Sequence, residues 1–177
     1  MSLSLVVLGA GDLGLRAATL RAGQGDEVWA LRRRNLPMPD GIHALYGDMQ
    51  DTETLRQLPY KPDVLLFCPT PDERTEQAYR RTYVDALRTA VQTLQPKRVL
   101  LVSSTAVYAQ NNGQWLDENS PAEAESFNGR VLREAEQLCL SRPGNTVLRL
   151  SGITGPGRHM LVNKALLGEA IHNTWTN

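Results

Sequence analysis

Short apolar runs alternate with amphipathic segments along the whole chain. The apolar runs contain few polar residues, which is typical of strands buried on both faces of a parallel sheet. Strands are predicted over Leu3–Leu8, Glu27–Leu31, His43–Tyr46, Asp63–Phe67, Arg98–Val102 and Asn145–Leu150. Apolar positions at helical spacing predict helices over Asp12–Ala22, Thr52–Leu58, Asp72–Leu94, Ala122–Leu140 and Met160–Ile171. Stretches that contain Gly, Pro or Asn predict loops over 32–41, 107–121 and 151–158.

This alternation predicts an α/β fold, a doubly wound parallel sheet of the Rossmann type. Right-handed crossovers lead to the strand order 3-2-1-4-5-6. Ligands of this architecture bind at the carboxyl ends of the strands. No shift in composition marks a boundary, so one domain over residues 1–177 is expected.

A glycine-rich loop joins the first predicted strand to the first predicted helix. Gly9-Ala10-Gly11-Asp12-Leu13-Gly14 matches G-x-G-x-x-G in the βαβ context that a dinucleotide site requires. Gly9 permits the tight turn, Gly11 lets the backbone approach a pyrophosphate, and Gly14 allows close packing of helix on strand. The free N–H groups at the helix N-terminus then attract the anion. A turn that binds nothing and an adenosyl site of a methyltransferase are the alternatives.

Three arginines follow the second strand, where NAD-binding proteins carry a carboxylate for the ribose 2′-hydroxyl. Guanidinium groups bind phosphate well, so Arg32 and Arg33, followed by Arg34, favour NADP over NAD. The alternative is a solvated basic run on a surface loop. The same run argues against a methyltransferase, whose ribose diol also requires a carboxylate at this place.

Composition excludes several other classes of function. Nineteen basic and nineteen acidic side chains give zero net charge, so neither nucleic acid nor a membrane surface is expected as a partner. No apolar run reaches the roughly 18 residues of a membrane span. Two cysteines form no disulfide framework and favour a reducing, cytoplasmic setting. The three histidines have no metal-ligand spacing, so no metal is expected.

Four ordered motifs resemble the extended short-chain dehydrogenase/reductase superfamily, in its NAD(P)-dependent epimerase/dehydratase branch. These are the glycine loop, Gly47-Asp48-Met49-Gln50-Asp51, the segment from Ser103 to Tyr108, and the segment from Arg149 to Arg158. The resemblance implies that Asp48 and Met49 flank the adenine, that Cys68, Pro69 and Thr70 line the diphosphate and ribose, and that Ser151 lies near the nicotinamide. It also implies that Ser104 is the catalytic hydroxyl, beside Ser103. A polar strand exit with local turn bonds is the alternative for both serines.

The chain departs from this family at its central motif. No tyrosine is followed four residues later by lysine, so Tyr-x-x-x-Lys is absent. Alignment on Glu134 places Arg130 at the lysine position and Ser126, a much weaker acid, at the tyrosine position. Tyr108, Tyr83 or His159 could donate the proton instead. Core packing is the alternative for Tyr83, and a strand-end aromatic is the alternative for Tyr108.

Two functions from different classes remain. The first is an NADP-dependent oxidoreductase or epimerase/dehydratase that acts on a carbonyl or secondary alcohol of a small-molecule substrate, for example a sugar nucleotide. The second is a regulatory protein that binds the dinucleotide as a redox signal without turnover. The resemblance further implies a homodimer through the helices at 72–94 and 122–140. It also implies that the family's C-terminal substrate-binding part is missing or truncated after Asn177.

Overall fold

The structure is a computed structural model that describes residues 2–153, 155 and 160–168. Its centre is a six-stranded parallel sheet with the order β3-β2-β1-β4-β5-β6, which confirms the predicted topology. The strands are β1 (Ser4–Leu8), β2 (Glu27–Arg32), β3 (Ile42–Tyr46), β4 (Val64–Phe67), β5 (Arg98–Ser104) and β6 (Thr146–Leu150).

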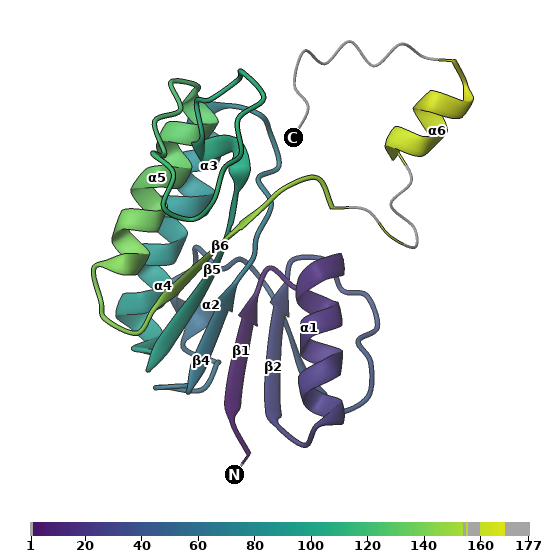
Figure 1. The fold of residues 1–177 in the computed structure, drawn as a ribbon. Coiled ribbons are helices and arrows are strands. Elements are labelled where there is room, and N and C mark those ends of the chain that lie inside the picture. Colours follow the sequence, from purple (N-terminus) through teal and green to yellow (C-terminus); the bar gives the residue numbers. More distant parts are fainter. Residues whose placement is uncertain (1, 154, 156–159, 169–177) are drawn as a thin grey trace.

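Helices cover both faces of this sheet (Figure 1). On one face lies α1 (Asp12–Gly23). The opposite face carries α2 (Thr52–Leu55), the run α3 (Glu76–Tyr79), η1 (Arg80–Asp85) and α4 (Ala86–Leu94), and α5 (Phe127–Leu140). A short 3₁₀ turn, η2 (Thr105–Val107), follows β5, and α6 (Met160–Leu166) is the last described helix. Among the described residues, no helix is both long and apolar enough to cross a membrane.

Two predicted helices begin later than their hydrophobic pattern indicates. The helix expected from Asp72 begins at Glu76, because the Thr75 hydroxyl caps it by accepting a hydrogen bond from the Ala78 amide at 3.2 Å. The helix expected from 122 begins at Phe127. The first of these also contains the π-helical segment η1, which no sequence signal predicts and which widens the helix by one residue per turn.

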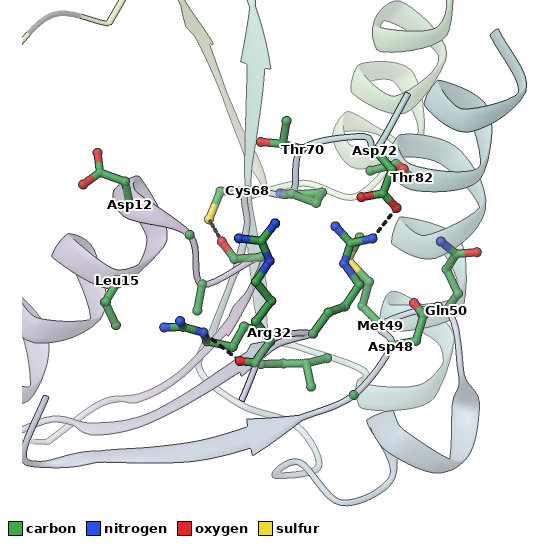
Figure 2. Close-up of a pocket in the computed structure, with 18 of the residues that line it drawn as sticks. Asp12, Leu15, Arg32, Asp48, Met49, Gln50, Cys68, Thr70, Asp72 and Thr82 are labelled. Atoms are coloured by element: carbon green, nitrogen blue, oxygen red, sulfur yellow. Dashed lines mark hydrogen bonds and ion pairs between the residues drawn. The ribbon is translucent and has the colours of Figure 1, made fainter. Parts of the chain in front are cut away.

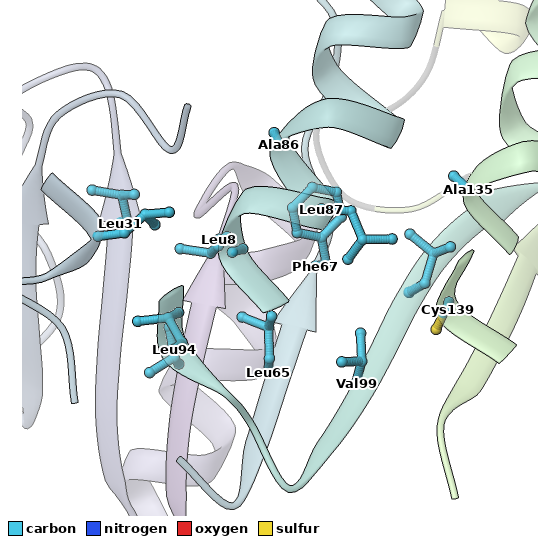
Figure 3. Close-up of a cluster of buried hydrophobic side chains, with 14 of the residues drawn as sticks. Leu8, Leu31, Leu65, Phe67, Ala86, Leu87, Leu94, Val99, Ala135 and Cys139 are labelled. Atoms are coloured by element: carbon cyan, nitrogen blue, oxygen red, sulfur yellow. The ribbon is translucent and has the colours of Figure 1, made fainter. Parts of the chain in front are cut away.

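The core has two layers because successive strand residues point to opposite faces. Val7 is fully buried against α1, whereas its neighbour Leu8 is fully buried on the other face. Figure 3 shows the larger layer, in which Leu8, Leu65 and Phe67 of the strands meet side chains of α4 and α5. Burial on both faces explains why the strands are continuous apolar runs rather than alternating ones.

The α1 face is covered unevenly. Over β1 and β2 the apolar side chains are buried, but Leu100 and Val102 of β5 are half-buried. Leu148 of β6, which pairs with Val102, remains 40% exposed in the described structure. The well-packed half of this face is therefore the half that carries the glycine loop.

Candidate functional site

The glycine loop forms a tight turn at the carboxyl end of β1. Gly9 has φ +90°, and the Gly9 and Ala10 amides both donate to the Leu31 carbonyl oxygen of β2, at 3.3 and 3.1 Å. A Cβ on Gly9 would lie 2.6 Å from the Pro69 nitrogen. Both the positive φ and this approach of the β4 exit require glycine.

The other two glycines differ in what surrounds them. A Cβ on Gly14 would lie 2.7 Å from the Cys68 sulfur and 2.7 Å from the Gly9 oxygen, so Gly14 allows α1 to pack closely on β1 and β4. A Cβ on Gly11 would meet nothing within 4 Å. Gly11 is also the N-cap of α1 and has no side chain to cover its first turn. The loop therefore leaves open space before a helix N-terminus, where anions bind favourably.

A cleft of about 800 Å³ opens in front of this turn, within the usual range for small-molecule sites. Figure 2 shows Asp12 and Leu15 on one side of it and Asp48, Met49, Asp72 and Thr82 on the other. The exits of β1, β2, β3 and β4 build its walls. It brings together most of the predicted cofactor residues: Gly9, Gly11, Asp12, Arg32, Arg33, Asp48, Met49, Cys68, Pro69 and Thr70.

The arginines after β2 already have partners within the protein, so they are less available to a ligand than the sequence suggests. Arg33 forms an ion pair with Asp72, and the Arg32 Nε donates to the Arg34 carbonyl oxygen at 3.1 Å. The hydrogen bond from Arg33 lowers the pKa of Asp72, and the charges of Arg33, Arg81 and Arg34 lower it further. One of the predicted phosphate ligands is thus already paired with a carboxylate.

The segment after β3 has one structural part and one that faces the cleft. Asp51 caps α2 by accepting from the Glu53 and Thr54 amides, both at 3.1 Å. Asp48 accepts from the Gln50 amide at 2.9 Å and lines the cleft together with Met49. The cap holds the turn in place, and the turn presents Asp48 and Met49 to the cleft.

Cys68, which follows β4, holds the glycine turn in place through a hydrogen bond. Its thiol donates to the Gly9 carbonyl oxygen at 3.3 Å (Figure 2). Burial raises the pKa of Cys68 to about 12, so the thiol keeps its proton near neutral pH. Cys68 is therefore a poor nucleophile, and its position ties β4 to the phosphate loop.

The two serines at the end of β5 do not line the cleft. The Ser104 oxygen accepts from the Ala106 amide at 3.2 Å and caps η2, which is the local turn bond considered as its alternative role. Ser103 is buried, and its hydroxyl donates to Glu136 Oε1 of α5 at 2.6 Å. The Ser103 hydroxyl therefore faces α5 rather than the cleft, and the assignment of Ser103 to the cofactor stays a prediction.

Tyr108 belongs to a hydrogen-bond network on the far side of β5. Its hydroxyl donates to the Asp117 carbonyl oxygen at 2.7 Å and accepts from Arg149 Nη1 at 2.9 Å. Arg149 also pairs with the buried Glu136 at 2.8 Å, and that hydrogen bonding raises the pKa of Arg149. The Tyr108 proton is thus donated to a backbone carbonyl in this structure, and its catalytic role stays a prediction.

The remaining predicted residues lie outside the cleft lining. Arg130, in the first turn of α5, donates to the Glu125 carbonyl oxygen at 2.5 Å and contacts Glu76 at 3.4 Å. Leu13 is half-buried in α1, and Ser151 is exposed after β6. His159 lies outside the described residues. The cleft thus gathers most of the predicted cofactor residues but none of the predicted catalytic ones.

Tyr83 packs within an aromatic group on η1. Its ring centroid lies 5.6 Å from that of Tyr79, which in turn contacts Phe127 edge-on at 5.5 Å. Burial, together with the nearby Tyr79 and Cys68, raises the pKa of Tyr83 to about 12. A phenol that holds its proton more tightly is a weaker general acid, so this geometry favours the packing role.

Two cleft residues were missed by reasoning from the sequence. Asp72 was predicted as the first residue of a helix, but it precedes the capped start of α3 and pairs with Arg33 across the cleft. Thr82 lies in η1 and is only 5% exposed, and its hydroxyl has no hydrogen-bond partner within the described part of the chain. Thr82 gives no recognisable signal, because a π-helical turn cannot be seen in the residue pattern.

Comparison with known proteins adds three findings. No protein-family model matches the chain. A stretch of 64 residues is 42% identical to protein YeeZ of Escherichia coli K12, covering 35% of this chain and 23% of that protein. A solved structure from Methylobacillus flagellatus, provisionally described as an NAD-dependent epimerase/dehydratase, is 37% identical with a TM-score of 0.80. The predicted family resemblance is confirmed.

The similarity to solved structures covers almost all of this chain but only part of each of those proteins. The match to the M. flagellatus protein covers 96% of this chain and 61% of that one. WbmG of Bordetella bronchiseptica, solved in complex with NAD, shares the fold at 18% identity, a TM-score of 0.76 and the same two coverages. The chain therefore spans about three-fifths of the length of these two structures.

Proposed function

We propose that this chain is the dinucleotide-binding part of an NADP-preferring oxidoreductase or epimerase/dehydratase. Its structural neighbours support a dinucleotide-dependent oxidoreductase or epimerase in general. The observation that carries the proposal is the cleft in which the glycine turn, the N-terminus of α1 and the arginines after β2 meet. The substrate would be a small molecule with a carbonyl or secondary alcohol, such as a sugar nucleotide.

The residues of the cleft fit such a cofactor. Open space in front of Gly11 accommodates a diphosphate beside the first turn of α1. Asp48, Met49 and the unpartnered Thr82 hydroxyl would contact the adenosine half, with Pro69 and Thr70 at the β4 exit. Arg32 and Arg33 would attract a 2′-phosphate. When bound, the nicotinamide ring supplies hydride transfer.

The hydrogen bonds of Tyr108 to Asp117 and Arg149 disfavour it as the proton donor in such a reaction. Ser104 lies at the carboxyl end of β5, half-exposed, and its hydroxyl hydrogen is not used in binding the Ala106 amide. We assign to it the hydrogen bond to a substrate oxygen. Arg130 aligns with the lysine of the family motif. It would contribute positive charge to the reaction only after releasing Glu125 and Glu76.

A second candidate function is dinucleotide sensing without turnover. It is favoured by the missing Tyr-x-x-x-Lys pair and by the commitment of the Tyr108 hydroxyl to Asp117. Turnover separates the two functions. Oxidation of NADPH with any member of a carbonyl panel, lost in Ser104→Ala, supports the enzyme. Tight NADPH binding without turnover on every substrate supports the sensor.

Calorimetry tests the cofactor. NADPH should bind several-fold more tightly than NADH, because the arginines add an attraction that only the 2′-phosphate receives. Arg32→Asp should reverse this order. Equal affinities for the two dinucleotides would refute the proposed preference for NADP. If neither dinucleotide binds, the proposed function itself is wrong.

The same proposal extends to assembly and location. The α3–η1–α4 run and α5 lie side by side, joined by Arg80–Glu134 and Arg130–Glu76 ion pairs, and offer a surface for a homodimer. Light scattering at increasing protein concentration tests the dimer. Cys68 and Cys139 are free thiols, which agrees with a cytoplasmic location that fractionation of cells would test.

A further inference from the structure

An ion pair crosses the cleft between two of its walls. Arg33 follows β2, and Asp72 lies 39 residues later in the connection from β4 to α3. Both line the cleft, and Figure 2 shows the dashed contact at Asp72 beside Thr82. Each side chain is about half exposed. The pair is therefore open to exchange with a ligand that carries either charge.

The cleft lining is balanced in charge, although the sequence run alone is strongly basic. Its three arginines are matched by three aspartates, at positions 12, 48 and 72. Asp12 pairs with Arg16 within α1 at 2.9 Å. Asp72 is the carboxylate that bonds directly to the run, and Arg34 and Arg81 also attract it.

A 2′-phosphate and the Asp72 carboxylate would compete for the same group. Both are planar or tetrahedral oxygen anions that bind a guanidinium through its N–H fork. If Arg33 stays paired with Asp72, the 2′-phosphate interacts with only part of the positive charge of the three arginines. If the phosphate takes Arg33, Asp72 becomes a like charge close to it.

We propose that Asp72 is a specificity-determining residue that acts through Arg33 and reduces the preference for NADP over NAD. This rests on the proposed function, since it concerns the same cleft. Asp72 is a positioning residue in this role, because it acts on the ligand through the guanidinium it holds. NADH lacks the competing phosphate, so its affinity does not depend on this ion pair.

The test compares the affinities of NADPH and NADH for the wild-type protein and Asp72→Asn by calorimetry. The substitution should tighten NADPH binding about threefold to fivefold, the range of a half-exposed ion pair, and change NADH binding less than twofold. Asp72→Glu should restore the wild-type ratio. Asp85→Asn is the matched control: Asp85 is exposed on η1, pairs weakly with Arg88 at 3.5 Å and lies outside the cleft lining, so the ratio should not move.

Salt provides a readout that a purely structural role would not move. The gain of Asp72→Asn for NADPH should shrink between about 0.05 and 0.5 M salt, because screening weakens the repulsion from Asp72. Parallel changes for both dinucleotides, or an unchanged NADPH affinity, would overturn the inference while leaving the proposed function in place. If the wild-type protein binds neither dinucleotide, the proposed function fails first, and the inference fails with it.

Discussion

Glu134 and Glu136 allow the effect of burial on an ion pair to be compared directly, because they lie two residues apart in α5 and each pairs with an arginine. Glu136 has a side chain only 4% exposed and accepts from Ser103 at 2.6 Å and from Arg149 at 2.8 Å. Glu134 pairs with Arg80, and both of those side chains are more than 40% exposed. The same substitution at the two positions should therefore have very different effects.

The structure sets the size of this difference. Removing one partner of a buried ion pair costs about 3–5 kcal/mol. Glutamine keeps one acceptor oxygen for Ser103, and Arg149 is 22% exposed and so partly hydrated. We therefore expect Glu136→Gln to lower the free energy of unfolding by about 2–3 kcal/mol. Glu134→Gln should lower it by no more than about 0.5–1 kcal/mol.

Urea unfolding followed by circular dichroism measures both values, with unchanged slopes as the check that each variant unfolds in one step. A double-mutant cycle with Arg149→Met tests the contact itself: the double variant should lose clearly less stability than the two single losses combined. If Glu136→Gln costs no more than Glu134→Gln, the buried network contributes nothing that the surface pair lacks, and the reasoning is wrong.

Three further predictions concern the cleft. Gly14→Ala should lower the free energy of unfolding by about 1–3 kcal/mol, because its Cβ meets backbone and sulfur atoms, whereas Gly11→Ala should leave the melting temperature unchanged and weaken dinucleotide binding; equal melting temperatures for the two would contradict this. Thr82→Val should keep or raise the melting temperature, since an unpartnered hydroxyl is removed, and weaken dinucleotide binding by about 1 kcal/mol in calorimetry; a large stability loss would show that the hydroxyl has a protein partner. Cys68 holds its proton to about pH 12 when folded and to about 9 when unfolded, so its contribution is complete below pH 9 and is lost as the pH rises toward 12; Cys68→Ala should flatten this decline in urea titrations, and an unchanged slope would refute it.

The fold and the phosphate loop could be predicted because each rests on a local pattern with one physical meaning. Val7 and Leu8 are both buried, on opposite faces, and this produces the unbroken apolar run that indicates a parallel sheet. Gly9 and Gly14 are required by contacts within one βαβ unit. Both patterns lie within a short stretch of sequence, so they can be recognised without knowledge of the tertiary structure.

The contacts of the residues after β5 could not be predicted in the same way, because their hydrogen-bond partners are distant in sequence. Tyr108 is bound by Arg149, 41 residues later, and Ser103 by Glu136, 33 residues later. The boundaries of the helix at Asp72 were misjudged for a related reason. Thr75 caps this helix, and Asp72, which precedes it, pairs with Arg33; hydrophobic periodicity reveals neither contact.

The buried network and the cleft share no residue in the described structure. Ser103, Glu136, Arg149 and Tyr108 join β5, β6 and α5, while the cleft is built at the exits of β1 to β4 and at η1. Substitutions in the loops after β5 and β6 should therefore leave the lining of the nucleotide cleft in place. The half of the sheet with β1 to β4 can then keep one cofactor site while the half with β5 and β6 acquires different catalytic residues.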